Sequence, residues 1–230
     1  MNKKLKIALV FYGQPRISNT QSYNSIKEKL LDIYDCDVYI HTWWSKEDYI
    51  NNISYIKSPW SQTQDLKVKD NIDNILEKMY KPKVLKCEKI KDFTEVSDML
   101  KRVPNAYNNI SQMYTLNESS KLIENYEQYD FIIKLRLDIV ILKMPKLEDL
   151  DKHKTYVIDT HIGREVFNDN IWILSIKHFK LFNMYNEKEQ YYEEIGTLNI
   201  EEILCHHAKK IGIYKEIIKI DENKFKINRF

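Results

Sequence analysis

The hydrophobic pattern at the start of the chain predicts a strand, a helix and a second strand. Residues 5–12 form an apolar run that ends at Gly-Gln-Pro, which is typical of a buried parallel strand. Apolar side chains then recur at helical spacing over 19–34, and residues 37–43 form a second apolar run. A strand, a helix and a strand in this order indicate a βαβ unit and a parallel sheet.

The rest of the chain continues this alternation. Residues 131–142 form the strongest predicted strand, and the polar stretch 45–80 reads as a long loop followed by a helix near 68–79. Further strands are expected at 83–87, 155–159, 170–175 and within 213–220, and further helices at 92–101, 109–128, 177–186 and 200–210. We therefore expect an α/β fold with a Rossmann-like, mostly parallel central sheet flanked by helices. A single domain, 1–230, should contain a nucleotide-binding half, about 1–142, and an acceptor half, about 143–230.

Composition narrows the classes of function. The chain has 36 basic and 34 acidic residues, a net charge of +2 and no long run of one sign. Because nucleic-acid binders gather basic residues on one face, we expect no nucleic-acid partner. Three widely spaced cysteines form neither a disulfide framework nor a zinc pattern, which favours the reducing cytoplasm. No apolar stretch approaches the roughly 20 residues of a membrane span, and peripheral association with a membrane stays open.

Arginine and glycine are scarce, which draws attention to the positions that keep them. The bias toward lysine, asparagine and isoleucine is that of an AT-rich genome, in which lysine would replace arginine wherever geometry allows. The retained residues are therefore candidates for a geometric role. They are Arg16, Arg102, Arg136, Arg164 and Arg229, with Gly13, Gly163, Gly196 and Gly212.

Charged residues interrupt the strand predicted over 131–142. Lys134, Arg136 and Asp138 are spaced by two, and side chains two apart share one face of a strand. Charges in a buried element are costly unless they are paired or coordinated. One interpretation is a structural Arg136–Asp138 ion pair at the strand end. The other is an anion site, in which Arg136 lies near a diphosphate and Asp138 holds a divalent metal, Mn²⁺ or Mg²⁺.

The turn Gly13-Gln14-Pro15-Arg16 follows the first strand, at the edge where open α/β sheets bind ligands. Gly13 allows a close backbone approach, Pro15 stiffens the turn, and Arg16 offers donors suited to phosphate. The turn matches neither Gly-x-Gly-x-x-Gly nor a P-loop, so neither a dinucleotide site nor an ATPase follows. The alternative is an ordinary turn with an exposed arginine.

The second strand ends in His41-Thr42-Trp43-Trp44. Two tryptophans at a strand end are suited to stacking on a base or a sugar ring. The alternative is a partly buried aromatic cluster, with His41 hydrogen-bonded to a backbone carbonyl.

Two further candidates lie in the second half. Asp169 precedes an apolar strand, where its carboxylate could act as a general base toward an acceptor hydroxyl, or could simply be a turn residue. His206 lies on the more polar face of the helix predicted over 200–210 and is a weak metal candidate. Its neighbour His207 shares the apolar face and is expected at the edge of the core.

Taken together, these segments resemble the WavE-like lipopolysaccharide-synthesis proteins and related bacterial and viral glycosyltransferases. The resemblance rests on the order and spacing of Gly-Gln-Pro-Arg, His-Thr-Trp, Gln112-Met113-Tyr114, the Tyr-Asp-x-x-Ile-Lys-x-Arg-x-Asp strand and Asp-Asn-x-Trp-Ile. It covers roughly residues 6–210. It implies a GT-A type fold, a nucleotide-sugar donor and transfer to a growing surface glycan or glycolipid, in a bacterium or in a virus-infected host cell.

The resemblance also implies roles for particular residues. Arg136-Leu-Asp138 stands at the place of the Asp-x-Asp metal motif, Gly13 to Arg16 would border the nucleotide, and Gln112 and Tyr114 would lie near the donor. Arg136 replaces the first aspartate of that motif. One carboxylate supplies few of the oxygen ligands that Mn²⁺ or Mg²⁺ needs, and Arg136 would neutralise part of the charge of the donor phosphates instead.

The leading hypothesis is glycosyl transfer, with Asp138 on the metal, Arg16 and Arg136 on the phosphates and Asp169 as the base. His41, Thr42 and Trp43 would complete the donor site. One alternative is a nucleotidyl- or phosphotransferase, which needs a second metal carboxylate that the sequence does not supply. Another is a non-catalytic nucleotide- or carbohydrate-binding protein, in which Trp43, Trp44 and Trp60 form a stacking platform.

Overall fold

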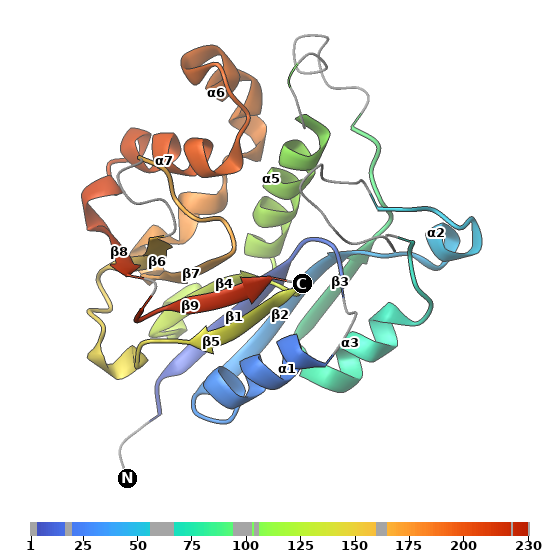
Figure 1. Cartoon of the computed structure of the whole chain (residues 1–230), viewed down its shortest axis with the longest axis horizontal. Coiled ribbons are helices and arrows are strands. Elements are labelled where there is room, and N and C mark those ends of the chain that lie inside the picture. The colour runs from blue at the N-terminus through green and yellow to red at the C-terminus, as the bar shows by residue number, and fades with distance from the viewer. Residues whose placement is uncertain are drawn as a thin grey trace.

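The computed structural model describes residues 4–16, 20–55, 67–93, 103, 106–159, 165–221 and 223–229. The strands of its central sheet are β1 (Lys6–Tyr12), β2 (Asp35–Trp43), β3 (Val84–Glu88), β4 (Phe131–Arg136), β6 (Thr155–Asp159), β7 (Ile171–Leu174) and β8 (Ile217–Asp221). Their order is β3-β2-β1-β4-β7-β6-β8 (Figure 1). β3, β2, β1 and β4 run parallel, β7 is antiparallel to both of its neighbours, and β8 is parallel to β6. The predicted α/β class with a mostly parallel sheet is confirmed.

Two hydrophobic cores lie on the two faces of the sheet. In β1, Val10 and Tyr12 belong to one core, whereas Leu9 and Phe11 belong to the other, because successive side chains of a strand point to opposite faces. The first face is covered by α5 (Ala106–Ser120) and α7 (Ile200–Lys210), with α6 (Lys188–Ile195) next to them. The second face carries α1 (Gln21–Ile26), α3 (Ile72–Tyr80) and a two-stranded sheet of β5 (Ile139–Lys143) and β9 (Lys226–Arg229) (Figure 1).

The strand predicted over 131–142 is wrong as a single element. β4 ends at Arg136, the chain turns at Leu137 and Asp138, and β5 leaves the central sheet to pair with β9. Ser22 of α1 lies at this turn, with its Oγ 2.7 Å from the carbonyl oxygens of both Leu137 and Ile139. Lys134 and Arg136 therefore keep the predicted spacing within β4, whereas Asp138 belongs to the turn.

Other boundaries also differ from the sequence prediction. The helix expected over 109–128 begins earlier and ends at Ser120, and the helix expected over 19–34 is α1 followed by a wider helical segment, Lys27–Leu31. The helix expected over 177–186 is a tighter 3₁₀ segment, Ile176–Phe182. The helix predicted over 92–101 falls almost entirely outside the described residues, whereas α2 (Lys46–Ile50) and β9 were not predicted.

None of the helices in the described part of the chain combines the length and the apolar character needed to cross a bilayer.

Lys134 connects β4 to the C-terminal end of α5. Its side chain is 2% exposed, and Nζ donates hydrogen bonds to the carbonyl oxygen of Leu116 and, over 2.6 Å, to Ser120 Oγ. The Leu116 carbonyl oxygen also accepts from the hydroxyl groups of Ser119 and Ser120, so the lysine joins a cluster of hydrogen bonds at the end of α5. Burial lowers the pKa of Lys134 well below its usual value. The buried amino group thus fixes the position of α5 against the sheet.

We expect Lys134→Ala to lower the free energy of unfolding by about 3–5 kcal/mol, because it removes a long buried side chain together with the two hydrogen bonds of its amino group. Lys134→Met keeps the volume, so its loss should be only about 1–3 kcal/mol, the cost of two lost hydrogen bonds at about 0.5–1.5 kcal/mol each. Urea unfolding followed by circular dichroism measures both. Equal losses in the two variants would contradict the packing part of this explanation.

Candidate functional site

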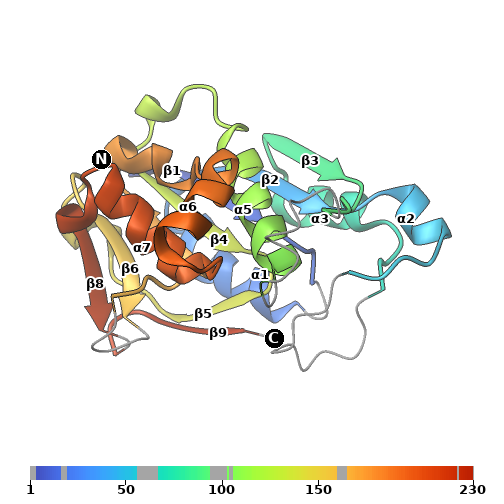
Figure 2. The same cartoon turned by 90° about the horizontal axis from the view of Figure 1, so that it is seen from above.

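A polar cavity of about 300 Å³ lies at the carboxyl ends of β1, β2 and β4. Open α/β sheets bind their ligands at this edge. The turn after β1 and the ends of β2 and β4 contribute lining residues, and so do α5 and the start of α7, two helices that contact each other on one face of the sheet (Figure 2). The lining residues are Tyr12, Gly13, Gln14, Arg16, Trp43, Asn108, Asn109, Ser111, Gln112, Thr115, Arg136, Asp169, Asn199, Ile200 and Glu201.

Arg136 and Asp138 form a buried, two-pronged ion pair beside this cavity. Arg136 Nε donates to Asp138 Oδ1 and Arg136 Nη2 donates to Asp138 Oδ2, both over 2.8 Å. The Asp138 side chain is 1% exposed and the Arg136 side chain 14%, so water screens the pair weakly. Burial alone would lower the pKa of Arg136, but the Asp138 carboxylate outweighs it and raises that pKa. The structural ion pair that the sequence suggested is present, and Arg136 also lines the cavity.

The turn after β1 brings a second guanidinium to the same carboxylate. Gly13 has φ +95°, in the left-handed region that favours glycine, and its carbonyl oxygen accepts a 2.8 Å hydrogen bond from Thr42 Oγ1. Gln14 Oε1 accepts from Arg16 Nε at 3.1 Å and from Nη2 at 2.9 Å. Arg16 Nη1 then lies 3.7 Å from Asp138 Oδ2. Gly13, Gln14, Arg16 and Arg136 thus lie together at the cavity, and Thr42 holds the turn through its hydrogen bond to Gly13.

Asp169 is held at the cavity by two hydrogen bonds. Gln112 Nε2 donates to its carboxylate, and the Tyr12 hydroxyl donates to its backbone carbonyl oxygen. Burial and the Asp169 carboxylate raise the pKa of Tyr12, so this hydroxyl stays protonated and remains a donor. The Asp169 charge also contributes to the raised pKa of Arg136. A carboxylate, an amide and a guanidinium therefore face the same space.

The donor set at Asp138 does not fit a divalent cation. Both carboxylate oxygens accept from Arg136, whereas Mg²⁺ and Mn²⁺ need several oxygen ligands. Within the described ranges, no three His, Cys, Asp or Glu side chains are grouped to hold a metal. Two like unit charges about 4 Å apart repel by roughly 4 kcal/mol at an effective dielectric constant of about 20, and the charge of a divalent ion doubles this. Asp138 is the partner of two arginines, so its contacts give the predicted metal role no support.

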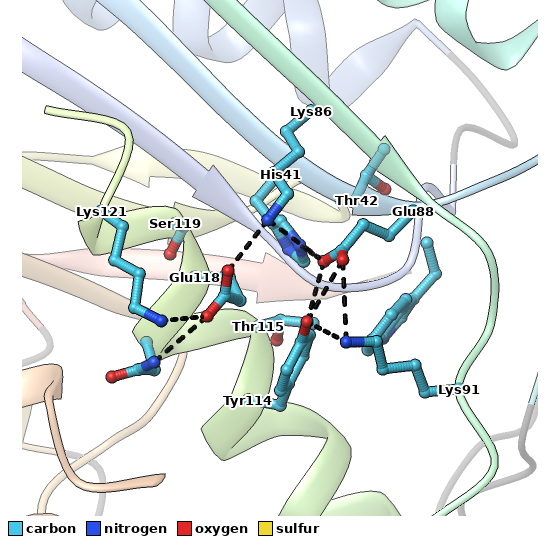
Figure 3. Close-up of polar contacts among 12 residues, drawn as sticks. His41, Thr42, Lys86, Glu88, Lys91, Tyr114, Thr115, Glu118, Ser119 and Lys121 are labelled. Atoms are coloured by element: carbon cyan, nitrogen blue, oxygen red, sulfur yellow. Dashed lines mark hydrogen bonds and ion pairs between the residues drawn. The ribbon is translucent and has the colours of Figure 1, made fainter. Parts of the chain in front are cut away.

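His41 and Tyr114 are not among the lining residues. They belong to a charged network between β2, β3 and α5 (Figure 3). His41 Nε2 lies 2.6 Å from Glu88 Oε2, and the Tyr114 hydroxyl donates to both oxygens of Glu88 over 3.2 Å. Burial lowers the pKa of His41 despite the nearby Glu88, so the imidazole is neutral at pH 7. These two residues support the cavity wall rather than face the cavity.

Trp43 links this network to the cavity. It is 2% exposed, its ring stacks on Tyr114 with centroids 5.3 Å apart, and its Nε1 donates to Ser111 Oγ over 3.1 Å. Trp44 turns elsewhere and donates to the Lys69 carbonyl oxygen. Trp60 lies outside the described residues. Trp43 and Trp44 therefore do not form a common stacking surface: Trp43 is buried in the core, and Trp44 contacts other residues.

His206 is paired with Glu194 over 2.6 Å, and neither residue lines the cavity. Its position gives the weak metal hypothesis no support. Arg102 and Arg164, which the scarcity of arginine singled out, lie outside the described residues.

Several lining residues were not predicted from the sequence. α5 contributes Asn108, Ser111 and Thr115, and the start of α7 contributes Asn199 and Glu201. The α5 residues recur at helical spacing, a signal that the sequence contains but that the apolar stripe of the same helix obscured. For Glu201 the sequence indicated only that a negative charge in the first turn of a helix interacts favourably with the helix dipole.

Comparisons with known proteins give structural likeness only. No family model matches the chain, and no curated protein matches it in sequence. The glycosyltransferase GlyE of Streptococcus pneumoniae TIGR4 is 11% identical with a TM-score of 0.44, over 96% of this chain and 46% of GlyE, so the chain spans less than half of that relative. A glycosyltransferase involved in glycosylation of the major capsid of PBCV-1 is 8% identical, with a TM-score of 0.44, over 95% of this chain and 82% of that protein.

The galactosyltransferase LgtC is a third similar structure, 11% identical with a TM-score of 0.44, over 95% of this chain and 74% of LgtC. These similar structures are glycosyltransferases, but TM-scores below 0.5 support no conclusion about activity. The WavE-like resemblance stays a prediction.

Glu118 is the most strongly paired carboxylate of the network in Figure 3. It accepts hydrogen bonds from Lys86 at 2.9 Å and Lys121 at 2.5 Å and is 8% exposed. Burial alone would raise its pKa, but these two lysines outweigh burial and lower the pKa from 4.5 to about 2. A carboxyl group with a lowered folded-state pKa stabilises the fold above its unfolded-state pKa and loses that contribution as pH falls toward the folded-state value.

We therefore expect the free energy of unfolding to fall as pH is lowered from 4.5 to about 2. Glu118→Gln should flatten the profile in this window and be less stable at pH 7, where the ion pairs are fully formed. Urea unfolding at a series of pH values measures both. Glu28→Gln, an exposed control at the protein surface, should keep the wild-type profile. A Glu118→Gln profile as steep as that of the wild type would contradict the assignment.

Proposed function

We propose that this chain transfers a sugar from a nucleotide-sugar donor to a hydroxyl group of a glycan or glycolipid acceptor. One observation carries the proposal: two arginines, Arg16 and Arg136, and a carboxylate, Asp169, line one polar cavity at the carboxyl edge of the sheet. Guanidinium groups suit a diphosphate. A carboxylate on the same cavity suits a hydroxyl group that must lose its proton.

The amides of the cavity suit a sugar. Asn108, Asn109, Gln112 and Asn199 line it, and each amide presents both donors and an acceptor. Sugar hydroxyl groups also donate and accept, so such a wall pairs with them in either direction. A volume of about 300 Å³ lies at the lower end of the range for ligand pockets, which fits a sugar diphosphate better than a whole polysaccharide.

In the proposed reaction, the bond between the anomeric carbon and the diphosphate oxygen breaks, and its electron pair leaves with the diphosphate. Arg16 and Arg136 stabilise this developing negative charge from fixed positions. The acceptor oxygen bonds to the anomeric carbon, and its proton passes to the Asp169 carboxylate. Gln112 and Tyr12 hold Asp169 in place for that transfer. Synthesis of a surface glycan, which the WavE-like resemblance implies, would supply such an acceptor.

The first experiment is a thermal-shift screen of nucleotide sugars and nucleoside diphosphates. A ligand at about 100 times its Kd adds about 2.7 kcal/mol to the free energy of unfolding, enough to raise Tm measurably. The stabilising donor is then assayed for transfer to a panel of oligosaccharide acceptors. Absence of any stabilisation in folded protein would contradict a nucleotide-sugar function.

We expect Asp169→Asn to lower kcat for transfer by about 100-fold or more, because the base is lost while the Gln112 hydrogen bond can be kept by the amide oxygen. The Kd of the donor, measured by titration calorimetry, should change little. Glu165→Gln is the matched control, since Glu165 is an exposed carboxylate outside the cavity lining, paired with Lys209. Full turnover in Asp169→Asn would exclude Asp169 as the base.

A further inference from the structure

We infer that Arg16 and Arg136 bind the donor diphosphate directly, without a divalent cation, and that Asp138 is the positioning residue for these two guanidinium groups. The inference rests on the proposed function, because it specifies how that function's donor is held. It also assigns Asp138 a role different from metal binding.

The first step concerns the carboxylate. Both oxygens of Asp138 accept 2.8 Å hydrogen bonds from Arg136, and the side chain is 1% exposed. Asp138 is not one of the residues that line the cavity, whereas Arg136 is. A cation bound by Asp138 would have to displace one guanidinium and remain beside the other. The carboxylate is thus placed behind the arginines, not between them and a ligand.

The second step concerns the donors that remain on Arg136. Its Nε and Nη2 are taken by Asp138, and no side chain or carbonyl in the described part of the chain hydrogen-bonds its Nη1. Because Arg136 lines the cavity, its guanidinium can present Nη1 to a phosphate oxygen while the other edge stays fixed. An arginine clamped on one edge loses little side-chain freedom when a ligand binds the other.

The third step concerns Arg16, whose guanidinium is held by Gln14 as well as by Asp138. Gln14 Oε1 accepts from its Nε at 3.1 Å and from its Nη2 at 2.9 Å, and the turn that carries it is held by the Thr42 hydrogen bond to Gly13. Its Nη1 lies 3.7 Å from Asp138 Oδ2. One buried carboxylate therefore serves two arginines, whose guanidinium groups bring to the diphosphate the positive charge that a metal would otherwise supply.

Titration calorimetry with UDP, GDP, ADP, CDP, dTDP and inorganic pyrophosphate tests this. The Kd of the tightest binder is measured in excess EDTA and in excess MnCl₂. We expect the two values to agree within about twofold, because guanidinium groups supply the positive charge. Arg136→Lys should weaken binding about tenfold in both conditions, since an ammonium group lacks the fork that Asp138 orients.

The role of Asp138 is tested by a double-mutant cycle with Asp138→Asn, with urea midpoints to confirm folding. If Asp138 acts through Arg136, its substitution should change the Kd in the wild-type background and hardly at all in the Arg136→Lys background. Asp159→Asn, at the end of β6 and outside the lining residues, is the matched control and should bind like the wild type.

Other outcomes separate this inference from the proposed function. Binding that tightens about tenfold or more with Mn²⁺, with the gain lost in Asp138→Asn, would overturn the inference and leave the nucleotide-sugar function standing. Additive effects of Asp138→Asn and Arg136→Lys would overturn the positioning role alone. No binding of any of these ligands by folded protein in either condition would overturn the proposed function and the inference together.

Discussion

The buried ion pair of Arg136 and Asp138 is the interaction on which the rest of the site depends. It closes the turn at which β4 ends and β5 leaves the central sheet, and it draws Arg16 to the same carboxylate. Removing one partner of such a pair typically costs 3–5 kcal/mol, because the other charge remains buried and unpaired. The position of the arginines is therefore set by folding itself, before any ligand binds.

Apolar runs made much of the sheet predictable. β1, β6 and α7 agree with the sequence prediction within a residue or so, because a continuous apolar run or a clear helical period leaves little ambiguity about a buried element. The break after Arg136 was missed for the same reason. Ile139 and Ile141 continue the apolar pattern, and only the hydrogen bonds made by Asp138 and Ser22 mark the turn. The Ser22 contact joins segments more than a hundred residues apart in sequence, and the Arg136–Asp138 pair that the spacing suggested fits a strand end as well as a turn, so neither fixes the break from the local pattern.

The part of the site that follows the parallel strands was predictable, because the carboxyl ends of these strands meet at one edge of the sheet. Arg16 and Arg136 were expected at the carboxyl edge of the sheet and Asp169 facing the acceptor, and all three line the cavity. His41 and Tyr114 were expected there too, but they lie in the network with Glu88. Their placement depends on how α5 packs against β2 and β3, and the hydrophobic pattern of the sequence does not determine that packing. The wall contributed by the start of α7 escaped prediction because it is assembled by tertiary packing alone.

α5 explains why so many polar groups can be buried together. Its first half faces the cavity, where Gln112 holds Asp169, and its end is fixed by Lys134 from β4. Trp43 reaches the same helix through Ser111. A buried amino group on β4 and a buried ion pair between β4 and the turn after it add little stability by themselves, since apolar residues of similar volume often stabilise as well. Their roles are positional: the ion pair holds Arg136 at the cavity, and Lys134 holds α5, which supplies further lining residues, against β4.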